Sequence, residues 1–578
     1  MVKKKLSSIL IILMAISQLH AVLTVQGKSE IILRYGLVGG YIGFNPLTSY
    51  SYTMLRSILW APLFTFNETW GAEPWAAEYA RDIDALTCEI KLRDNLYWHD
   101  GQPVTSYDYK FTWELLINYP TTQTRFVENI ESIEIINDKV FRVHTKQAAG
   151  GYRIFLTSVA VPVPKHVFEA KGLTGGNALT YENIPPIGNG PFKFVEYRPG
   201  DSVTFEAFDK FFYGRPKIDK LIIKLFASVD AMVAALTAGE IDVVSDVPWS
   251  VGASLLKNPE LYVSAAEIPC YRSIYINQYP EKVGHPALSD LFVRRAIAMC
   301  IDKDGINSLI HPIFTVGWTP ITPKWPFFNE GILEIAPKYN VSEAATLLEA
   351  SGYVDGDGDG IREDPKTGRP LVFRLWVYNE YPEEIRAAEF IREGLRHAGM
   401  DCEIRAMEAV LWDYVVSPPY DWDLALWGWT VHDPISCWFP YTSKAIQAGW
   451  SSSGYHNNTF DELYQTLLNS TSYNEFLNVQ HQLQKHFVEN VVEIVLYHEA
   501  FTSVWRTEWT GFSNNPCGVF WYGFNSKAFI NVQPTVTTPL KGVGWGDFLL
   551  PAVIVIAILL VVVVTIIYKK KKGGSTKE

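Results

Sequence analysis

The stretch IKLRDNLYWHDGQPV, at residues 90–104 of the 578-residue chain, is the most informative part of the sequence. Apolar and polar side chains alternate along its first residues, as they do in a β-strand with one buried face. Asp100 and Gly101 follow as a turn signal, and Asp108 stands where a helix would begin. The stretch therefore predicts a strand, a tight turn and the start of a helix.

Strand and helix signals alternate on both sides of this stretch. Strand-like runs occur at residues 31–35 and 221–225, and helical periodicity covers residues 383–397 and 476–488. Gly399 then follows the first helical segment as a natural stop. No repeat of 20–50 residues is visible, which disfavours solenoids and propellers. We expect an α/β architecture in which sheets and helices are interleaved.

The composition limits the classes of function. The chain is 19% charged and 48% hydrophobic, as in ordinary globular proteins. Its formal net charge is −12 and its lysine-rich runs lie at the termini, so nucleic acid is not an expected partner. Neither HExxH, GxSxG nor a CxxC pair is present, and we do not expect an enzyme. Paired carboxylates of a glycosidase stay open, because their separation in space is not visible in a sequence.

The two ends of the chain predict a membrane-tethered extracellular protein. Three lysines and an apolar run predict a signal peptide over residues 1–28, with an uncleaved N-terminal anchor as the alternative. Residues 548–568 carry no charge and, as a helix, are long enough to cross a hydrocarbon core about 30 Å thick. The segment 569–578 begins with lysines, which predict that it lies on the cytoplasmic side of the membrane. We therefore expect a single-pass protein of the cell membrane, with residues 531–547 as a short tether.

Two further features agree with an extracellular location. Sequons for possible glycosylation occur at Asn67, Asn340, Asn457 and Asn469. The six cysteines show no zinc-binding spacing, and an oxidising compartment permits disulfides. Their connectivity stays open, since six cysteines allow fifteen complete pairings.

Four more motifs follow residues 90–104 along the chain. They are IGNGPFK at 187–193, AGEID at 238–242, FVRRAIAMCIDK at 292–303, and the segment 420–434, which contains Trp427-Gly428-Trp429 and Asp433-Pro434. With these five motifs in this order, the chain resembles the extracellular solute-binding proteins of dipeptide/oligopeptide-type ABC importers (family 5 solute-binding proteins) over residues 31–524. A C-terminal anchor without a lipidated cysteine resembles the archaeal form of these proteins.

The resemblance implies a two-lobed, periplasmic-binding-protein-like α/β fold of the large peptide-binding type, with an extra inserted small domain. Lobe I would comprise residues 29–66, 187–277 and 505–530, the inserted domain 67–186, and lobe II 278–504. The implied function is the capture of oligopeptides outside the cell by a monomer that delivers them to ABC permease subunits in the membrane. Oligosaccharide binding and a sensory role are the alternatives, although the cytoplasmic tail is too short for a signalling domain.

The resemblance also suggests where a ligand would bind. In peptide-binding relatives, an acidic residue a few positions after a Gly-Trp pair anchors the amino terminus of the ligand. Here the segment after Gly428-Trp429 is two residues shorter, and Asp433 matches the acidic residue before proline. Asp433 could have taken over the anchoring role, or the ligand could lack an amine. We predict ligand contacts for Trp429, Asp433, Trp427, Tyr271 and Asn277.

Residues 355–364 match the first part of a helix-loop-helix calcium loop. Carboxylates occupy positions 1, 3 and 5 (Asp355, Asp357 and Asp359), and the carbonyl of Ile361 would supply position 7. Position 12 is Lys366, so Glu363 or Asp364 would have to complete the ligands. The simpler alternative is a solvated acidic turn. Because three adjacent carboxylates repel one another without a cation, we favour a structural Ca²⁺ site.

Overall fold

The computed structural model describes residues 30–39, 43–48, 52–67, 72–121, 123–148, 160–310, 313–379, 382–407, 411–431, 433–513 and 527–535. Within these residues no helix combines the length and the apolar character that crossing a membrane requires. The predicted signal peptide at 1–28, the apolar segment at 548–568 and the tail at 569–578 all lie outside them.

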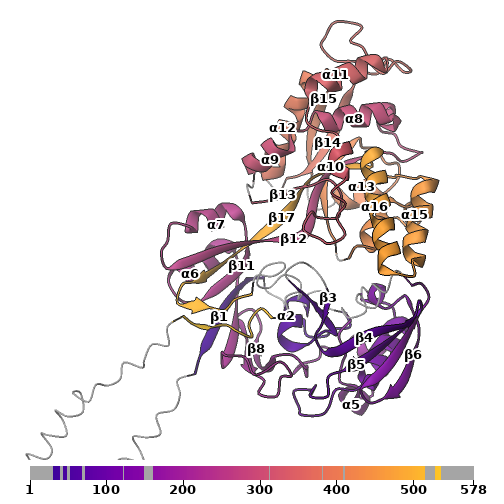
Figure 1. Cartoon of the computed structure of the whole chain (residues 1–578). Coiled ribbons are helices and arrows are strands. Elements are labelled where there is room, and N and C mark those ends of the chain that lie inside the picture. Colours follow the sequence, from indigo (N-terminus) through magenta and orange to yellow (C-terminus); the bar gives the residue numbers. More distant parts are fainter. Residues whose placement is uncertain are drawn as a thin grey trace, which may run out of the picture.

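One large mixed sheet runs through the molecule. Its strands are β1 (Ile32–Val38), β8 (Phe192–Arg198), β9 (Ser202–Ala207), β10 (Lys220–Phe226), β11 (Val243–Val247), β12 (Leu261–Ile276), β13 (Thr315–Val316), β14 (Val372–Tyr378), β15 (Asp401–Met407), β16 (Leu424–Thr430) and β17 (Glu493–Arg506). The order is β15-β14-β16-β12-β17-β11-β1-β10-β9-β8, and β13 pairs with β17. Figure 1 shows two lobes, with β12 and β17 running from one to the other.

The sheet changes from one lobe to the other at a bulge between β12 and β17. Glu267 lies opposite Ala500 and Tyr271 lies opposite His498, so three residues of β12 face the single residue Glu499. Strand β16 pairs with β12 only from Cys270 to Ile276. The predicted lobe boundaries at 277 and 505 both lie C-terminal to this bulge, because the two strands continue through it without a break.

The inserted domain contains the diagnostic stretch. A four-stranded sheet of order β4-β5-β7-β6 is formed by β4 (Ala77–Asp84), β5 (Thr87–Leu92), β6 (Ile130–Asn137) and β7 (Val140–Thr145), beside α3 (Ser106–Asn118) and α5 (Lys165–Ala170). As predicted, a strand is followed by a turn at Gly101, whose φ is 90°. The Thr105 N–H then donates to the Asp108 carboxylate at 2.7 Å, which closes a capping box at the start of α3.

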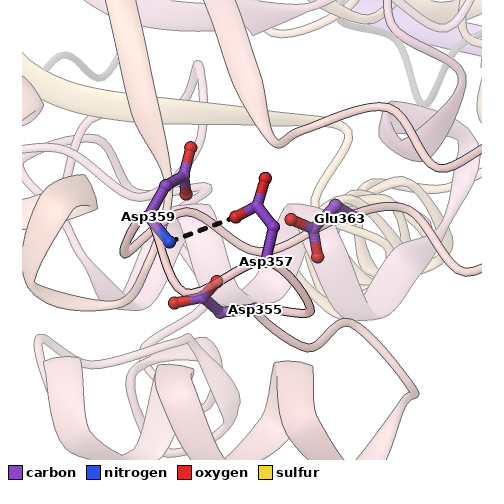
Figure 2. Close-up of side chains that lie close together, drawn as sticks. All are labelled: Asp355, Asp357, Asp359 and Glu363. Atoms are coloured by element: carbon purple, nitrogen blue, oxygen red, sulfur yellow. Dashed lines mark hydrogen bonds between the residues drawn. The ribbon is translucent and has the colours of Figure 1, made fainter.

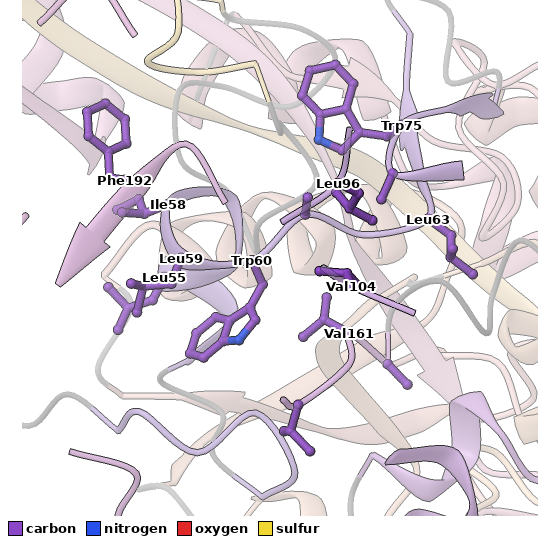
Figure 3. Packing of buried hydrophobic residues seen from close by; sticks show 14 of the residues in the cluster. Leu55, Ile58, Leu59, Trp60, Leu63, Trp75, Leu96, Val104, Val161 and Phe192 are labelled. Atoms are coloured by element: carbon purple, nitrogen blue, oxygen red, sulfur yellow. The ribbon is translucent and has the colours of Figure 1, made fainter. Parts of the chain in front are cut away.

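Lobe I and the inserted domain share one hydrophobic core. Trp60, which follows α2 (Tyr52–Leu59), packs in one cluster with Trp75, Leu96 and Val104 of the inserted domain and with Phe192 of β8 (Figure 3). The short hairpin of β2 (Phe64–Phe66) and β3 (Ala72–Pro74) lies at the join. Because their core is continuous, these two parts form one body.

The glycine-rich motif at 187–193 also belongs to this join. A Cβ at Gly188 would lie 1.8 Å from the carbonyl oxygen of Leu59, so only glycine allows the two backbones to approach. His99 accepts a hydrogen bond from the Gly188 N–H at its Nδ1 (3.2 Å), and its Nε2 lies 3.1 Å from the Gly190 carbonyl. Burial lowers the pKa of His99 to about 4, so the ring is neutral and donates from Nε2.

The remaining helices cover the two lobes. In lobe I, α6 (Val229–Thr237) and α7 (Trp249–Leu255) cover one face of the sheet. In lobe II, α8 (Leu291–Met299), α9 (Lys303–Ile310), α11 (Val341–Ala350) and α12 (Pro382–His397) surround one core. A second core lies under α10 (Ile332–Ile335), α15 (Asn458–Asn469) and α16 (Tyr473–Glu489). Helices α12 and α16 confirm the two helices predicted from periodicity.

Further short elements lie in lobe II and near the C-terminal end of lobe I. Helices α13 (Leu411–Val416) and α14 (Ser443–Gln447) and the 3₁₀ segment η5 (Ser436–Tyr441) belong to lobe II, and β18 (Trp509–Thr510) pairs with β19 (Gln533–Pro534) near the C-terminal end of lobe I. Cys88, Cys300, Cys402 and Cys437 are buried free thiols. The Cys270 Sγ lies 3.0 Å from the Thr430 Oγ1, and Cys517 lies outside the described residues.

Candidate ligand-binding site

An aromatic face lies on lobe II where its strands reach the bulge. Tyr271 of β12 stands opposite Trp429 of β16, and Trp427 lies two residues away on the same face of the sheet. The rings of Trp427 and Tyr378 are 5.0 Å apart, and those of Trp429 and Trp450 are 6.4 Å apart. Three predicted ligand residues are therefore gathered on one surface.

This aromatic face also meets lobe I. Phe64 of β2 belongs to lobe I, and it packs against the same hydrophobic cluster as Trp429, a cluster whose buried members include Tyr271. The two lobes are therefore in contact beside the aromatic face. A solute held there would be enclosed by both lobes.

The three aromatic residues differ in how much of each is exposed. Tyr271 is 2% exposed, its hydroxyl lies 2.8 Å from that of Tyr441, and burial raises its pKa well above the ordinary range. Trp427 and Trp429 are half-buried, and the Trp429 Nε1–H donates to Ser452 Oγ at 3.4 Å. Trp429 and Trp427 can therefore offer ring surface to a ligand, while Tyr271 lies buried beside Trp429 as its cross-strand partner.

Asp433 and Asn277 are used within the protein. Asp433 is 4% exposed, and its Oδ1 accepts the N–H groups of Ile435 and Ser436, each at 2.7 Å, at the start of η5. Asn277 is fully buried and donates to the carbonyls of Tyr420 (2.9 Å) and Trp422 (2.6 Å). Both N–H groups of the Asn277 amide are thus used by backbone carbonyls, which leaves no donor for a ligand. The Asp433 carboxylate is likewise used by backbone N–H groups of its own turn.

Charged residues beside the bulge were not predicted. Arg272 Nε lies 2.8 Å from Glu499 Oε1 and 3.2 Å from Glu384 Oε1. Burial raises the pKa of Glu384 to about 8, although the charge of Arg272 opposes this shift. The residue of the sequence that could have indicated this charged cluster is Gly428, which stands between two tryptophans. A Cβ there would lie 2.3 Å from the Tyr271 carbonyl oxygen and 2.6 Å from Arg272 Nη1, so the glycine leaves room for the neighbouring strand and for the guanidinium.

The acidic loop converges as a metal site would. Asp355, Asp357, Asp359 and Glu363 each have a carboxylate oxygen within 4.8 Å of the others (Figure 2). Asp364 is not part of this group, because it is 3% exposed and accepts the Lys366 N–H at 2.8 Å. Of the two residues that could complete the ligands, the loop therefore brings in Glu363. Carboxylates in this number and spacing fit calcium, which prefers oxygen ligands.

The four sequons lie at different structural positions. Asn340 and Asn457 cap α11 and α15, where their side-chain oxygens accept backbone N–H groups. Asn469 is exposed at the end of α15, and Asn67 follows β2 and is half-exposed.

Two lobes that are joined by a strand crossover beside an aromatic face define a solute-binding protein of the periplasmic type. The profile of bacterial extracellular solute-binding proteins, family 5, matches residues 71–449. The chain belongs to this family.

Curated relatives extend over most of the chain. It is 25% identical over 480 residues to the oligopeptide-binding protein AppA of Bacillus subtilis, an alignment that covers 80% of this chain and 86% of the relative. It is 23% identical over 338 residues to the glutathione-binding protein GsiB of Pectobacterium atrosepticum, with 58% and 60% covered.

Solved structures share the fold. CtaP, an ABC transporter substrate-binding protein of Listeria monocytogenes, superposes with a TM-score of 0.75 at 21% identity, covering 88% of this chain and 100% of that one. AppA of B. subtilis, in complex with a nonapeptide, gives a TM-score of 0.65 at 24% identity, covering 87% and 100%. These likenesses confirm the predicted mixed α/β, two-lobed architecture.

Proposed function

We propose that this protein captures oligopeptides outside the cell and delivers them to the permease of an ABC importer. Membership of the solute-binding family and the likeness to a curated oligopeptide-binding protein support this role. The observation that carries the proposal is the aromatic face of Trp427 and Trp429, which lies where Phe64 brings lobe I against lobe II. A solute that touched both lobes would favour the closed arrangement, and no chemical step is required.

A thermal-shift screen tests the ligand class. The full chain in detergent is melted with dipeptides to nonapeptides and, separately, with mannose oligomers. A ligand that binds only the folded state stabilises it by about 2.7 kcal/mol at 100 times its Kd, so a rise in Tm reports binding. We expect peptides to raise the Tm, Trp429→Ala to abolish the rise, and Tyr262→Ala, which alters an exposed ring of lobe I, to preserve it.

Oligosaccharides are the alternative ligands. The flat rings of Trp429 and Trp450, 6.4 Å apart and tilted by 31°, are suited to sugar faces as well as to peptide side chains. A rise in Tm with mannose oligomers and none with peptides would show that the protein binds sugars rather than peptides.

We further propose that one C-terminal helix at residues 548–568 holds the body outside the cell membrane. The charge-free apolar segment and the lysines after it support this topology. In intact cells, an epitope after residue 578 should resist protease until the membrane is opened, whereas lobe I should be cleaved from outside. Cleavage of the epitope in intact cells would contradict the topology.

We also propose that the acidic loop binds a structural Ca²⁺. The convergence of Asp355, Asp357, Asp359 and Glu363 supports it, and the millimolar calcium outside cells matches the affinity of extracellular sites, about 10⁻⁴–10⁻³ M. The ion would hold together a surface loop and would take no part in solute capture.

A further inference from the structure

The carboxylate of Glu267 stands directly before the bulge that separates the two lobes. Glu267 pairs with Ala500 on the lobe I side of the crossover, and the register shifts immediately after it. The residue is 5% exposed, so water does not satisfy its oxygens. Such a carboxylate is stable only where protein groups supply the hydrogen bonds.

Its hydrogen-bond partners all come from lobe II. The hydroxyls of Thr315 and Thr322 donate to its two oxygens, and Lys324 Nζ lies 3.2 Å away. Thr315 belongs to β13, which pairs with β17 at His498, on the lobe II side of the bulge. The contacts therefore bridge the hinge, from a strand residue of one lobe to a loop and a strand of the other.

The second crossover strand carries a comparable contact. Glu499, the single residue of β17 that faces the bulge, is held at 2.8 Å by Arg272 Nε of lobe II. Both crossover strands therefore have an acidic side chain at the bulge, and each is bound by lobe II. A rotation of the lobes about the bulge must stretch or break the contacts of Glu267, because its partners would move relative to β12.

We propose that Glu267 is a positioning residue that holds the lobes in the arrangement in which Phe64 contacts lobe II. Charge-assisted hydrogen bonds of a buried carboxylate are about twice as strong as neutral ones. Their loss leaves buried groups unsatisfied, so the closed form loses its advantage over the open form. This inference rests on the proposed function only where it concerns affinity, since the interlobe angle is measurable without any solute.

The experiment measures the distance between the lobes in the ligand-free, full-length protein. Spin labels are introduced as noncanonical amino acids at two exposed positions, Glu131 of β6 and Glu462 of α15, and their separation is read by double electron–electron resonance. Glu267→Gln keeps the size of the side chain but replaces one carboxylate oxygen by an amide NH₂, which cannot accept a hydrogen bond from the threonine hydroxyls. Thr322→Val removes one donor, and Thr322→Ser restores the hydroxyl.

We expect Glu267→Gln to reduce the short-distance population relative to the long-distance one about tenfold, the effect of a single contact of about 1.4 kcal/mol. Thr322→Val should shift the distribution in the same direction, and Thr322→Ser should return it to that of the wild type. Thr346→Val, which removes a hydroxyl that donates to the Ser342 carbonyl on α11, is the matched control and should change nothing.

Two results would overturn the inference. One is an unchanged distance distribution in both Glu267→Gln and Thr322→Val, even if their Tm falls, because Glu267 would then only stabilise the fold. The other is a shift in Thr322→Ser as large as that in Thr322→Val. Failure of peptides to bind would contradict the proposed function and leave this result intact.

Discussion

At the scale of single residues, a neutral imidazole explains why residues 90–104 and the glycine motif at 187–193 occur together. His99 accepts from the Gly188 N–H and donates towards the Gly190 carbonyl, so the turn of one motif is fixed to the backbone of the other. Glycine is needed because α2 ends against this motif. A Cβ at Gly188 would overlap the carbonyl oxygen of Leu59. Two motifs at least 83 residues apart in sequence therefore form one contact.

Gly188→Ala should destabilise the protein severely. The added Cβ would overlap a backbone oxygen, which cannot rotate away, and such overpacking costs about 3 kcal/mol or more where the backbone must move. We expect a Tm several degrees below that of the wild type, measured by circular dichroism. Gly176→Ala is the control, because a Cβ there would make ordinary contact with the Tyr119 ring at 3.4 Å. An equal Tm in the two variants would contradict the close approach.

Glu493 should make stability depend on pH. Burial raises its pKa to about 8 from an ordinary value of 4.5, and the hydrogen bonds from Tyr441 and Ser273 only partly oppose this shift. Because the folded state holds the proton more tightly than the unfolded one, the contribution of this carboxyl to stability is fully present below pH 4.5 and is lost as the pH rises to 8. The loss is up to about 5 kcal/mol.

Glu493→Gln removes this titration. We expect the Tm of the variant to rise relative to that of the wild type as the pH increases from 5 to 9. Part of the pH dependence of the Tm should remain in the variant, because the pKa of Glu384 is raised to about 8 as well. The measurement is a series of thermal melts across this range. Glu489→Gln, at the exposed end of α16, is the control. Parallel pH profiles for Glu493→Gln and the wild type would show that the buried carboxyl does not titrate as expected.

The ligand residues show how far sequence reasoning reaches at this scale. Trp427 and Trp429 were identified by a motif, and their alternation along a strand places them on one face. Asp433 was predicted because it matches the acidic residue before proline in the motif, and Asn277 because the resemblance places it on the crossover, but both side chains bind backbone groups of the protein. The partners of Asn277 lie more than 140 residues away, where no local pattern reveals them, whereas Asp433 binds N–H groups two and three residues further along the chain.

At the scale of secondary-structure elements, local patterns were predictable and long-range register was not. Helices α12 and α16 follow from apolar residues at helical spacing, and the capping box of α3 follows from Thr105 and Asp108. The bulge between β12 and β17 depends on pairing across more than 220 residues, which no local pattern encodes. For this reason the bulge itself, and Glu267 beside it, were not predicted.

The acidic loop is an element whose behaviour is testable on its own. If it binds Ca²⁺, a chelator should lower the Tm of the wild type, and excess calcium should restore it, because an ion bound only to the folded state stabilises that state. Asp357→Asn removes one converging carboxylate and should make the Tm insensitive to chelator. Magnesium, which demands a tighter geometry, is the control ion. A chelator without effect on the wild type would leave the loop a solvated acidic turn.

At the scale of the whole molecule, continuity of the hydrophobic core defines the moving parts better than continuity of the chain. The inserted domain has its own sheet, yet its apolar residues join those of lobe I in one cluster. Lobe II has separate cores on the two faces of its strands. The protein therefore comprises two bodies, with the bulge of β12 and β17 between them (Figure 1).

The division into two bodies predicts which parts of the protein a single core mutation destabilises. Trp60 is 1% exposed in the shared core, and replacing a buried tryptophan by alanine costs about 3–5 kcal/mol. In hydrogen–deuterium exchange, Trp60→Ala should speed exchange in β1 and β10 of lobe I and equally in β5 and β7 of the inserted domain, while α12 keeps its protection. Trp422→Ala, at a fully buried tryptophan of lobe II, should have the reverse effect. If Trp60→Ala exposed the inserted domain alone, the two sheets would unfold as separate units and the molecule would consist of three bodies rather than two.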